Sequence, residues 1–127
     1  MMRRAIVSVI LFSAGLIVCS NAWSWSKEGG KVKFSRADAN VCQIFERDAA
    51  VIILNRQEGR PLEYPWDADS PPFELQKQER ANMLVEAQAI PIESTAEKRM
   101  AVGEEFTKRA MVNCLRFFLV TQPEQKP

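Results

Sequence analysis

Three carboxylates in one aromatic segment are the side chains whose types and spacing best suit chemistry. Glu63, Asp67 and Asp69 lie close together in the chain, beside Tyr64 and Trp66. Two acids next to an aromatic surface are typical of sugar hydrolysis. Aspartates are also favoured in turns and as helix caps. We therefore interpret these acids as a turn and as the cap of the next helix, with hydrolysis as the alternative.

The residue types in the chain give little indication of a metal or cofactor site. The same acids could bind calcium, but they lack the glycine and the terminal glutamate of a calcium loop. The chain has no histidine, which removes the commonest zinc ligand and the histidine-based catalytic triads. Its five glycines form neither a phosphate loop nor a dinucleotide fingerprint. The sequence predicts no catalytic residue, no metal and no cofactor, and hence no enzyme.

The segment from Leu62 to Phe73 is the best candidate for a binding surface. Tyr64 and Trp66 are residue types that anchor interfaces. Arg56 and Arg60 could grip a carboxylate or a phosphate, although arginines in this position also complement a helix C-terminus. The possible binding surface comprises Leu62, Tyr64, Trp66, Asp67, Asp69, Arg56 and Arg60. The alternative, which we favour, is that the segment is a lid on the hydrophobic core.

The N-terminus resembles a signal peptide. Arg3 and Arg4 precede an uncharged apolar run, and small residues at Ser20 and Ala22 suit a signal peptidase. We predict a signal peptide over 1–22, with cleavage after Ala22, and a periplasmic or secreted mature protein.

Two alternatives to cleavage after Ala22 stay open. The apolar run from Ala5 to Cys19 has fifteen residues, and a membrane-spanning helix needs about 20; an uncleaved anchor is therefore the less favoured interpretation. Lipid modification of Cys19 is the other, but Val18 stands where a lipobox has a small residue.

The charge balance argues against nucleic acid and against anionic membranes as partners of the mature form. Loss of residues 1–22 leaves fifteen basic and sixteen acidic side chains, a net charge of −1. Proteins that bind polyanions carry a basic face, whereas here opposite charges interleave. We interpret the run Glu46-Arg47-Asp48 as part of a solvated helix face. Another protein is the expected partner, and the oligomeric state is left open.

Two cysteines remain after the predicted cleavage. Export would place Cys42 and Cys114 in an oxidising compartment, which favours a disulfide. A redox-active pair usually has the spacing Cys-x-x-Cys, which is absent. The bridge would close a loop of about 73 residues and stabilise the fold by roughly 4 kcal/mol.

Helical periodicity and capping signals predict three helices of roughly 23, 17 and 26 residues. The first begins after Ser35 and ends at Gly59, before Pro61. The second covers about 73–89, capped by Asp69 or Ser70, with a proline in its first turn. The third follows the capping box Ser94-Thr95-Ala96-Glu97.

These elements define the expected fold class: an all-α protein, a small bundle of about three helices with an ordered proline-rich aromatic loop and one disulfide. The domain would cover 35–121, after a leader at 23–34 and before a tail at 122–127. Gly29 and Gly30 interrupt the leader, and the residues after them could be extended. Docking of Trp23 and Trp25 onto the domain and a frayed terminus are left as alternatives.

One resemblance can be stated from these residues. The residues that carry it are Cys42, the run Arg56-Gln57-Glu58-Gly59, the segment from Ala87 to Pro91, Lys98, Phe106 and Cys114. They resemble a group of small exported proteins of Gram-negative bacteria without an assigned activity, over about 75 residues from Cys42 to Arg116. The resemblance implies helices and a disulfide, and it implies no mechanism.

Among functions, we favour a protein-binding module such as an inhibitor, an immunity protein or an adaptor. An envelope protein that protects against stress by binding unfolded chains is the first alternative. A small hydrolase using Asp67 and Asp69 is the second.

Overall fold

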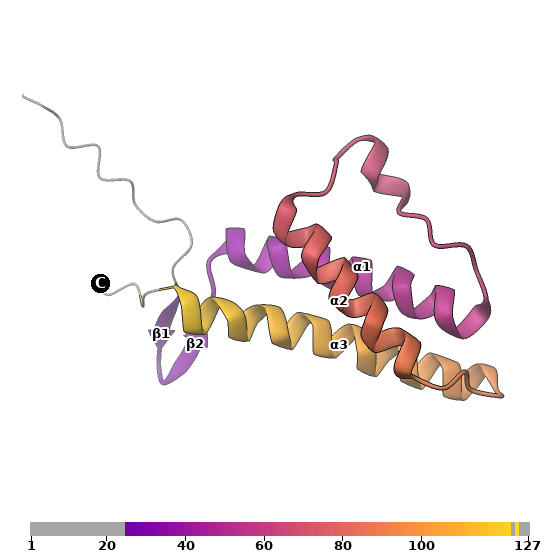
Figure 1. Ribbon diagram of the computed structural model, residues 1–127. Helices are drawn as coiled ribbons and strands as arrows, with labels where there is room; N and C mark the ends of the chain where they lie inside the picture. The colour runs from indigo at the N-terminus through magenta and orange to yellow at the C-terminus, as the bar shows by residue number, and fades with distance from the viewer. Residues whose placement is uncertain (1–24, 123, 125–127) are drawn as a thin grey trace, which may run out of the picture.

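The chain folds into three helices and one small hairpin, as the computed structural model shows for residues 25–122 and 124 (Figure 1). The elements are β1 (Ser26–Glu28), β2 (Lys31–Lys33), α1 (Arg36–Glu58), the 3₁₀ turn η1 (Pro65–Ala68), α2 (Glu74–Ala89) and α3 (Ala96–Thr121). The predicted all-α class with one disulfide is confirmed. The predicted signal peptide and its cleavage site lie outside the described residues.

Local signals account for the bounds of α1. The Ser35 hydroxyl accepts a hydrogen bond from the Asp38 backbone N–H at 3.2 Å, which satisfies one of the free donors of the first turn. Gly59 ends the helix with φ of 66°, a left-handed conformation that favours glycine.

The start of α2 differs from the prediction. The residue preceding its first turn is Phe73, which makes no side-chain capping bond. Asp69 instead ends η1, where its backbone N–H bonds to the Trp66 carbonyl. The prediction that Asp69 or Ser70 caps α2 is therefore wrong. The predicted proline in the first turn of α2 is wrong as well, since both prolines, at 71 and 72, precede Phe73. They separate the two elements, because proline disfavours helical conformation in the residue before it.

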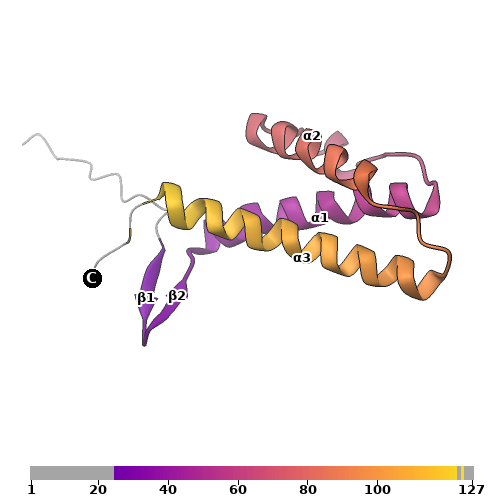
Figure 2. The ribbon, with the colours of Figure 1, turned by 60° about the horizontal axis from the view of Figure 1, so that its bottom comes forward.

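The two long helices, α1 and α3, lie side by side and antiparallel (Figures 1 and 2). The disulfide Cys42–Cys114 joins the start of α1 to the end of α3, with the two Cα atoms 5.4 Å apart. Phe45 and Phe118 are buried around it. This confirms the predicted pairing of the cysteines.

Helix α2 packs on α1 but stays apart from α3. The main core cluster between the helices consists of Ala49, Ile52, Ile53, Met83, Ala87 and Phe106. No Cα atom of α2 lies within 8 Å of one in α3. Side chains alone therefore fill the space between these two helices, and they leave part of it open.

The leader forms a hairpin that the sequence did not predict as such. β1 and β2 pair antiparallel across Gly29 and Gly30, whose φ angles of 57° and 78° suit a tight two-residue turn. The Trp25 indole N–H donates to the Gln122 carbonyl at 3.0 Å. Of the two alternatives for the leader, the docked one holds for Trp25, while Trp23 lies outside the described residues.

Among the described residues, no helix is both long enough and apolar enough to cross a bilayer.

We expect the disulfide to be a major part of the stability. Replacing Cys42 and Cys114 by Ser should lower the free energy of unfolding by about 4 kcal/mol, because the bridge restricts a long loop in the unfolded chain. Urea titration of the oxidised protein and of the double variant measures the change. Reductant should lower the midpoint of the wild type and leave that of the variant unchanged. Equal midpoints before and after reduction of the wild type would contradict the expectation.

Candidate functional site

The aromatic loop is fastened to the helices by the guanidinium of Arg80, on α2. Its Nε and Nη2 donate to the two carboxylate oxygens of Asp48, on α1, at 2.8 and 3.2 Å. Its Nη1 and Nη2 donate to the two oxygens of Asp67, in η1, at 2.8 and 2.7 Å. One guanidinium thus holds two carboxylates in forked pairs, the strongest geometry for this interaction.

Asp48 and Arg80 are both buried, so the stability of the fold depends on their pairing. The side chain of Asp48 is fully buried and that of Arg80 is 9% exposed. The Gln76 amide, one turn before Arg80, donates a further hydrogen bond to Asp48 at 2.9 Å. A buried carboxylate is strongly destabilising unless it is paired and hydrogen-bonded. Asp48 meets both conditions.

Asp48 does not belong to a solvated helix face, so the interpretation of the run Glu46-Arg47-Asp48 is wrong for this residue. Its position was readable in part, since it lies between Phe45 and Ile52 on the apolar stripe of α1. The partners on α2, Gln76 and Arg80, are four residues apart and share one helix face. A polar pair at this spacing, facing an acid on an apolar stripe, is the signal that could have indicated the network.

Two arginines clamp the aromatic rings of the loop. The Arg80 Cζ lies 3.6 Å from the centroid of the Tyr64 ring, and the Arg47 Cζ lies 4.0 Å from that of Trp66. The two rings meet edge to face, with centroids 6.4 Å apart. Cation–π contacts of this kind are worth about 0.5–2 kcal/mol each, depending on solvation. The rings are therefore engaged with the protein's own helices.

The polar ends of these aromatic side chains are enclosed as well. The Tyr64 hydroxyl and the Trp66 indole N–H are buried, and neither has a hydrogen-bond partner in the described part of the chain. Burial raises the pKa of Tyr64. Tyr64 also packs against the main core cluster. Tyr64, with Trp66 beside it, thus covers the core in the manner of a lid, while Leu62 remains 38% exposed.

Arg56 and Arg60, the two arginines of the predicted binding surface, each bind a different partner. The Arg56 Nε donates to the Ile90 carbonyl at 3.1 Å, just past the end of α2. Arg60 pairs at the surface with Glu58, at 2.7 Å. The structure does not bring Arg56 and Arg60 together around a shared anion site.

The acids proposed for hydrolysis are likewise not paired with each other. Both oxygens of Asp67 accept hydrogen bonds from Arg80, and these bonds hold its pKa below the ordinary aspartate value. A general acid needs the opposite shift. Asp69 lies exposed at the end of η1. No group of three or more potential metal ligands occurs within residues 25–122 and 124.

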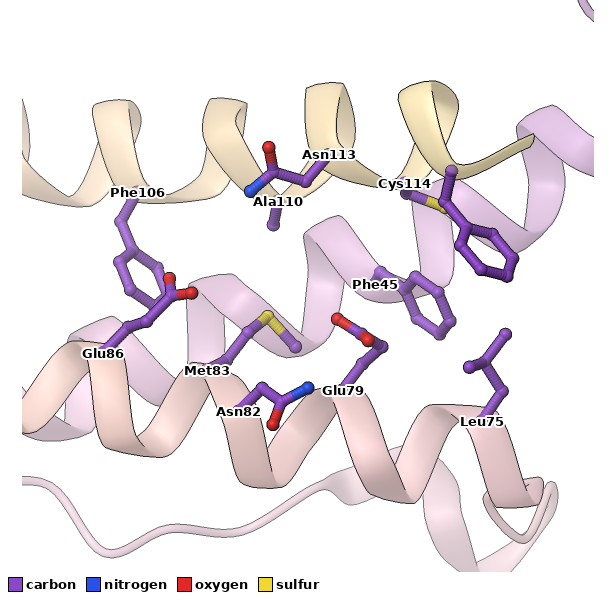
Figure 3. A pocket seen from close by; sticks show the side chains of 11 residues that line it. Phe45, Leu75, Glu79, Asn82, Met83, Glu86, Phe106, Ala110, Asn113 and Cys114 are labelled. Carbon is purple, nitrogen blue, oxygen red and sulfur yellow. The ribbon is translucent and has the colours of Figure 1, made fainter. Parts of the chain in front are cut away.

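A groove between α2 and α3 is a second candidate site, and the sequence analysis did not identify it. Its volume is about 230 Å³. Figure 3 shows Met83 reaching from α2 into the space between the helices, with Phe106 reaching back from α3 and Phe45 behind them. The groove exists because α2 packs against α1 and stays apart from α3. Its presence therefore depends on the tertiary packing of the three helices.

The polar side chains along this groove are acids and amides. Glu79 and Glu86 extend from α2 over the opening, with Asn82 on the same helix and Asn113 on α3 (Figure 3). None of the residues that line it is basic. On α3, the Arg109 Cζ lies 5.7 Å from the Phe106 ring centroid. The groove therefore combines an apolar floor with an acidic wall.

Comparison with known proteins adds no family. No family model, curated protein or solved structure matches the chain. The resemblance to small exported proteins of Gram-negative bacteria stays a prediction.

We expect Arg80→Met to destabilise the fold by about 3–5 kcal/mol, because it leaves the buried charge of Asp48 uncompensated. The double variant Asp48→Leu with Arg80→Met should regain much of this loss, since it removes the buried charge as well. The matched control Arg109→Met breaks an exposed pair with Glu105 at 3.8 Å and a cation–π contact with Phe106 at 5.7 Å, and it should change stability by at most about 1 kcal/mol. Urea titration measures all three, and equal effects of the two single arginine variants would refute the proposed importance of the network.

The ion pair of Asp67 should also appear in the pH dependence of stability. Because its pKa is lowered in the folded state, the pair stabilises the protein above the ordinary aspartate pKa. That contribution is lost as the pH falls through the lowered value. Asp67→Asn should therefore be less stable than the wild type at pH near 7 and approach it in strong acid, as urea midpoints across pH would show. The control Asp69→Asn should change stability little at pH near 7, because this exposed side chain has no ion pair among the described contacts. A constant difference for Asp67→Asn would contradict the expectation.

Proposed function

We propose that the protein is a protein-binding module that acts outside the cytoplasm, and that its docking surface is the groove between α2 and α3. The partner is a segment that carries an apolar side chain next to basic residues. An inhibitor, an immunity protein or an adaptor would each bind in this way.

The observation that carries the proposal is the separation of α2 from α3 above an apolar floor. Phe45, Met83 and Phe106 form this floor and are themselves 5%, 6% and 2% exposed. At the α3 edge, Phe117 is 45% exposed. Insertion of one apolar side chain here would remove apolar area of both partners from water, which contributes roughly 25 cal/mol per Å².

The acidic wall supports a partner of opposite charge. Glu79 and Glu86 lie about two turns apart on one face of α2. Neither carboxylate takes part in an ion pair among the described residues. Complementary charge at an interface edge raises the rate of association and selects the partner. A basic residue beside the inserted side chain would meet these acids.

The aromatic loop is the weaker candidate for the same role. Tyr64 and Trp66 face the arginines of their own chain, and Asp67 is bound by Arg80. A partner would have to displace these contacts, and it would leave buried charges unpaired.

The disulfide supports action in an oxidising compartment, because such bridges persist mainly in exported proteins. The predicted signal peptide points in the same direction.

Two synthetic helical peptides test the groove: one with leucine at every fourth position flanked by lysine, and one with glutamate in place of lysine. We expect fluorescence anisotropy to show binding of the lysine peptide only. The variant Glu79→Gln with Glu86→Gln should weaken that binding roughly tenfold, equivalent to about 1.4 kcal/mol. Phe117→Ala should weaken it as well, because it removes apolar contact area.

The matched control is Glu63→Gln with Glu97→Gln, which changes the net charge equally at exposed positions outside the groove. It should bind the lysine peptide as the wild type does. Binding that is insensitive to Glu79 and Glu86, or equally sensitive to the control pair, would reject the groove as the docking surface.

A further inference from the structure

A larger groove lies on the face formed by α1 and α3. It has a volume of about 590 Å³, and no residue of α2 lines it. Two large apolar side chains along the groove are exposed to solvent: Leu54 on α1, with 42% exposure, and Met100 on α3, with 66%. Exposed apolar surface of this kind, bordered by charges, is typical of protein interfaces.

The register between α1 and α3 determines which residues share a level across this face. The disulfide places Cys42 level with Cys114. Further along, Gly103 faces Ile53, whose Cγ2 would lie 3.8 Å from a Cβ added at Gly103. Both contacts describe the same antiparallel register, in which one step forward along α1 is one step back along α3.

This register matches acids on α1 with bases on α3 at both ends of the groove. Glu46 falls level with Ala110, within one turn of Lys108. Glu58, at the other end, falls level with Lys98 and next to Arg99. Between the ends, Leu54 falls level with Val102, within one turn of Met100.

We propose that this face binds a second copy of the chain about a two-fold axis parallel to the helices. Such an axis keeps every residue at its own level and lays α1 of each copy over α3 of the other. All neighbouring helices are then antiparallel, as in an up-and-down four-helix bundle. Each α2 stays outside this bundle.

Charge and apolar patterns are both self-complementary in this arrangement. Glu46 of each copy lies within a turn of Lys108 of the other, and Leu54 lies over Met100. The interface between the copies therefore places opposite charges at its edge and apolar side chains at its centre, as stable interfaces do. The net charge of the chain is only +1, so two copies do not repel each other appreciably.

The size of the face sets the expected strength. Fourteen residues line the groove, whereas standard interfaces use about 20–30 residues on each side. The dimer should therefore be a weak one, which forms in the micromolar range.

Charge reversal tests the arrangement by sedimentation equilibrium of the oxidised protein, over a series from about 1 to 500 µM. The wild type should dimerise. Glu46→Lys alone and Lys108→Glu alone should each weaken the dimer roughly tenfold or more, because each places like charges opposite one another twice. An equimolar mixture of the two single variants should restore wild-type association, since both edge pairs of the mixed dimer are again complementary. An ion pair within one chain predicts no such recovery on mixing.

The control mixture combines Glu63→Lys with Lys31→Glu, exposed positions away from the face that carry the same charge changes. Each control variant should dimerise as the wild type does, with no gain on mixing. A monomer at all concentrations, an unaffected dimer in the single reversals, or no recovery in their mixture would overturn the proposal. Peptide binding in the α2/α3 groove is independent of all these outcomes.

Discussion

The guanidinium of Arg80 is the point where three parts of the chain meet. It binds Asp48 on α1 and Asp67 in η1, it covers the Tyr64 ring, and it reaches all of them from α2. A buried carboxylate such as Asp48 is tolerated only when it is paired. The orientation of α2 on α1 and the path of the loop are consequently linked, because neither can change without separating these charges.

Asp38 shows how the protein handles a buried acid that lacks such a partner. Its carboxylate oxygens are enclosed at the start of α1 and have no hydrogen-bond partner in the described part of the chain. Burial raises its pKa, which reduces the penalty by favouring the neutral form. Asp48 and Asp67 instead form ion pairs with Arg80, which supplies the compensating charge. The start and the middle of α1 thus use different solutions to the same desolvation problem.

The same constraints shape the surfaces that the protein offers. The disulfide ties α3 to α1 at one end. The Gln57 amide, at the other end of α1, binds the Pro91 carbonyl and the Glu93 N–H in the connection to α3. The hydrogen bonds of Arg80 join α2 to α1 and to η1. Because α3 is fixed to α1 while α2 stays apart from α3, one groove opens between α2 and α3. The opposite groove, between α1 and α3, is not covered by α2.

The sequence by itself determined the helices and the disulfide. Helix caps act within a few residues and apolar periodicity acts within single helices, so both are readable locally. Ser35 and Gly59 bound α1 as predicted, whereas α3 is capped by Thr95, one residue after the predicted Ser94. The pairing of Cys42 with Cys114 followed from their number and from the helices that carry them. The hairpin depends on the local Gly29-Gly30 turn. The contact of Trp25 with Gln122, the burial of Asp48 and both grooves were decided by tertiary structure. Asp48 and Arg80 are 32 residues apart, and a charge beside apolar positions has the same local pattern whether water or a distant arginine is its partner. The grooves depend on the angle between helices, which arises only when the faces of all three are packed together.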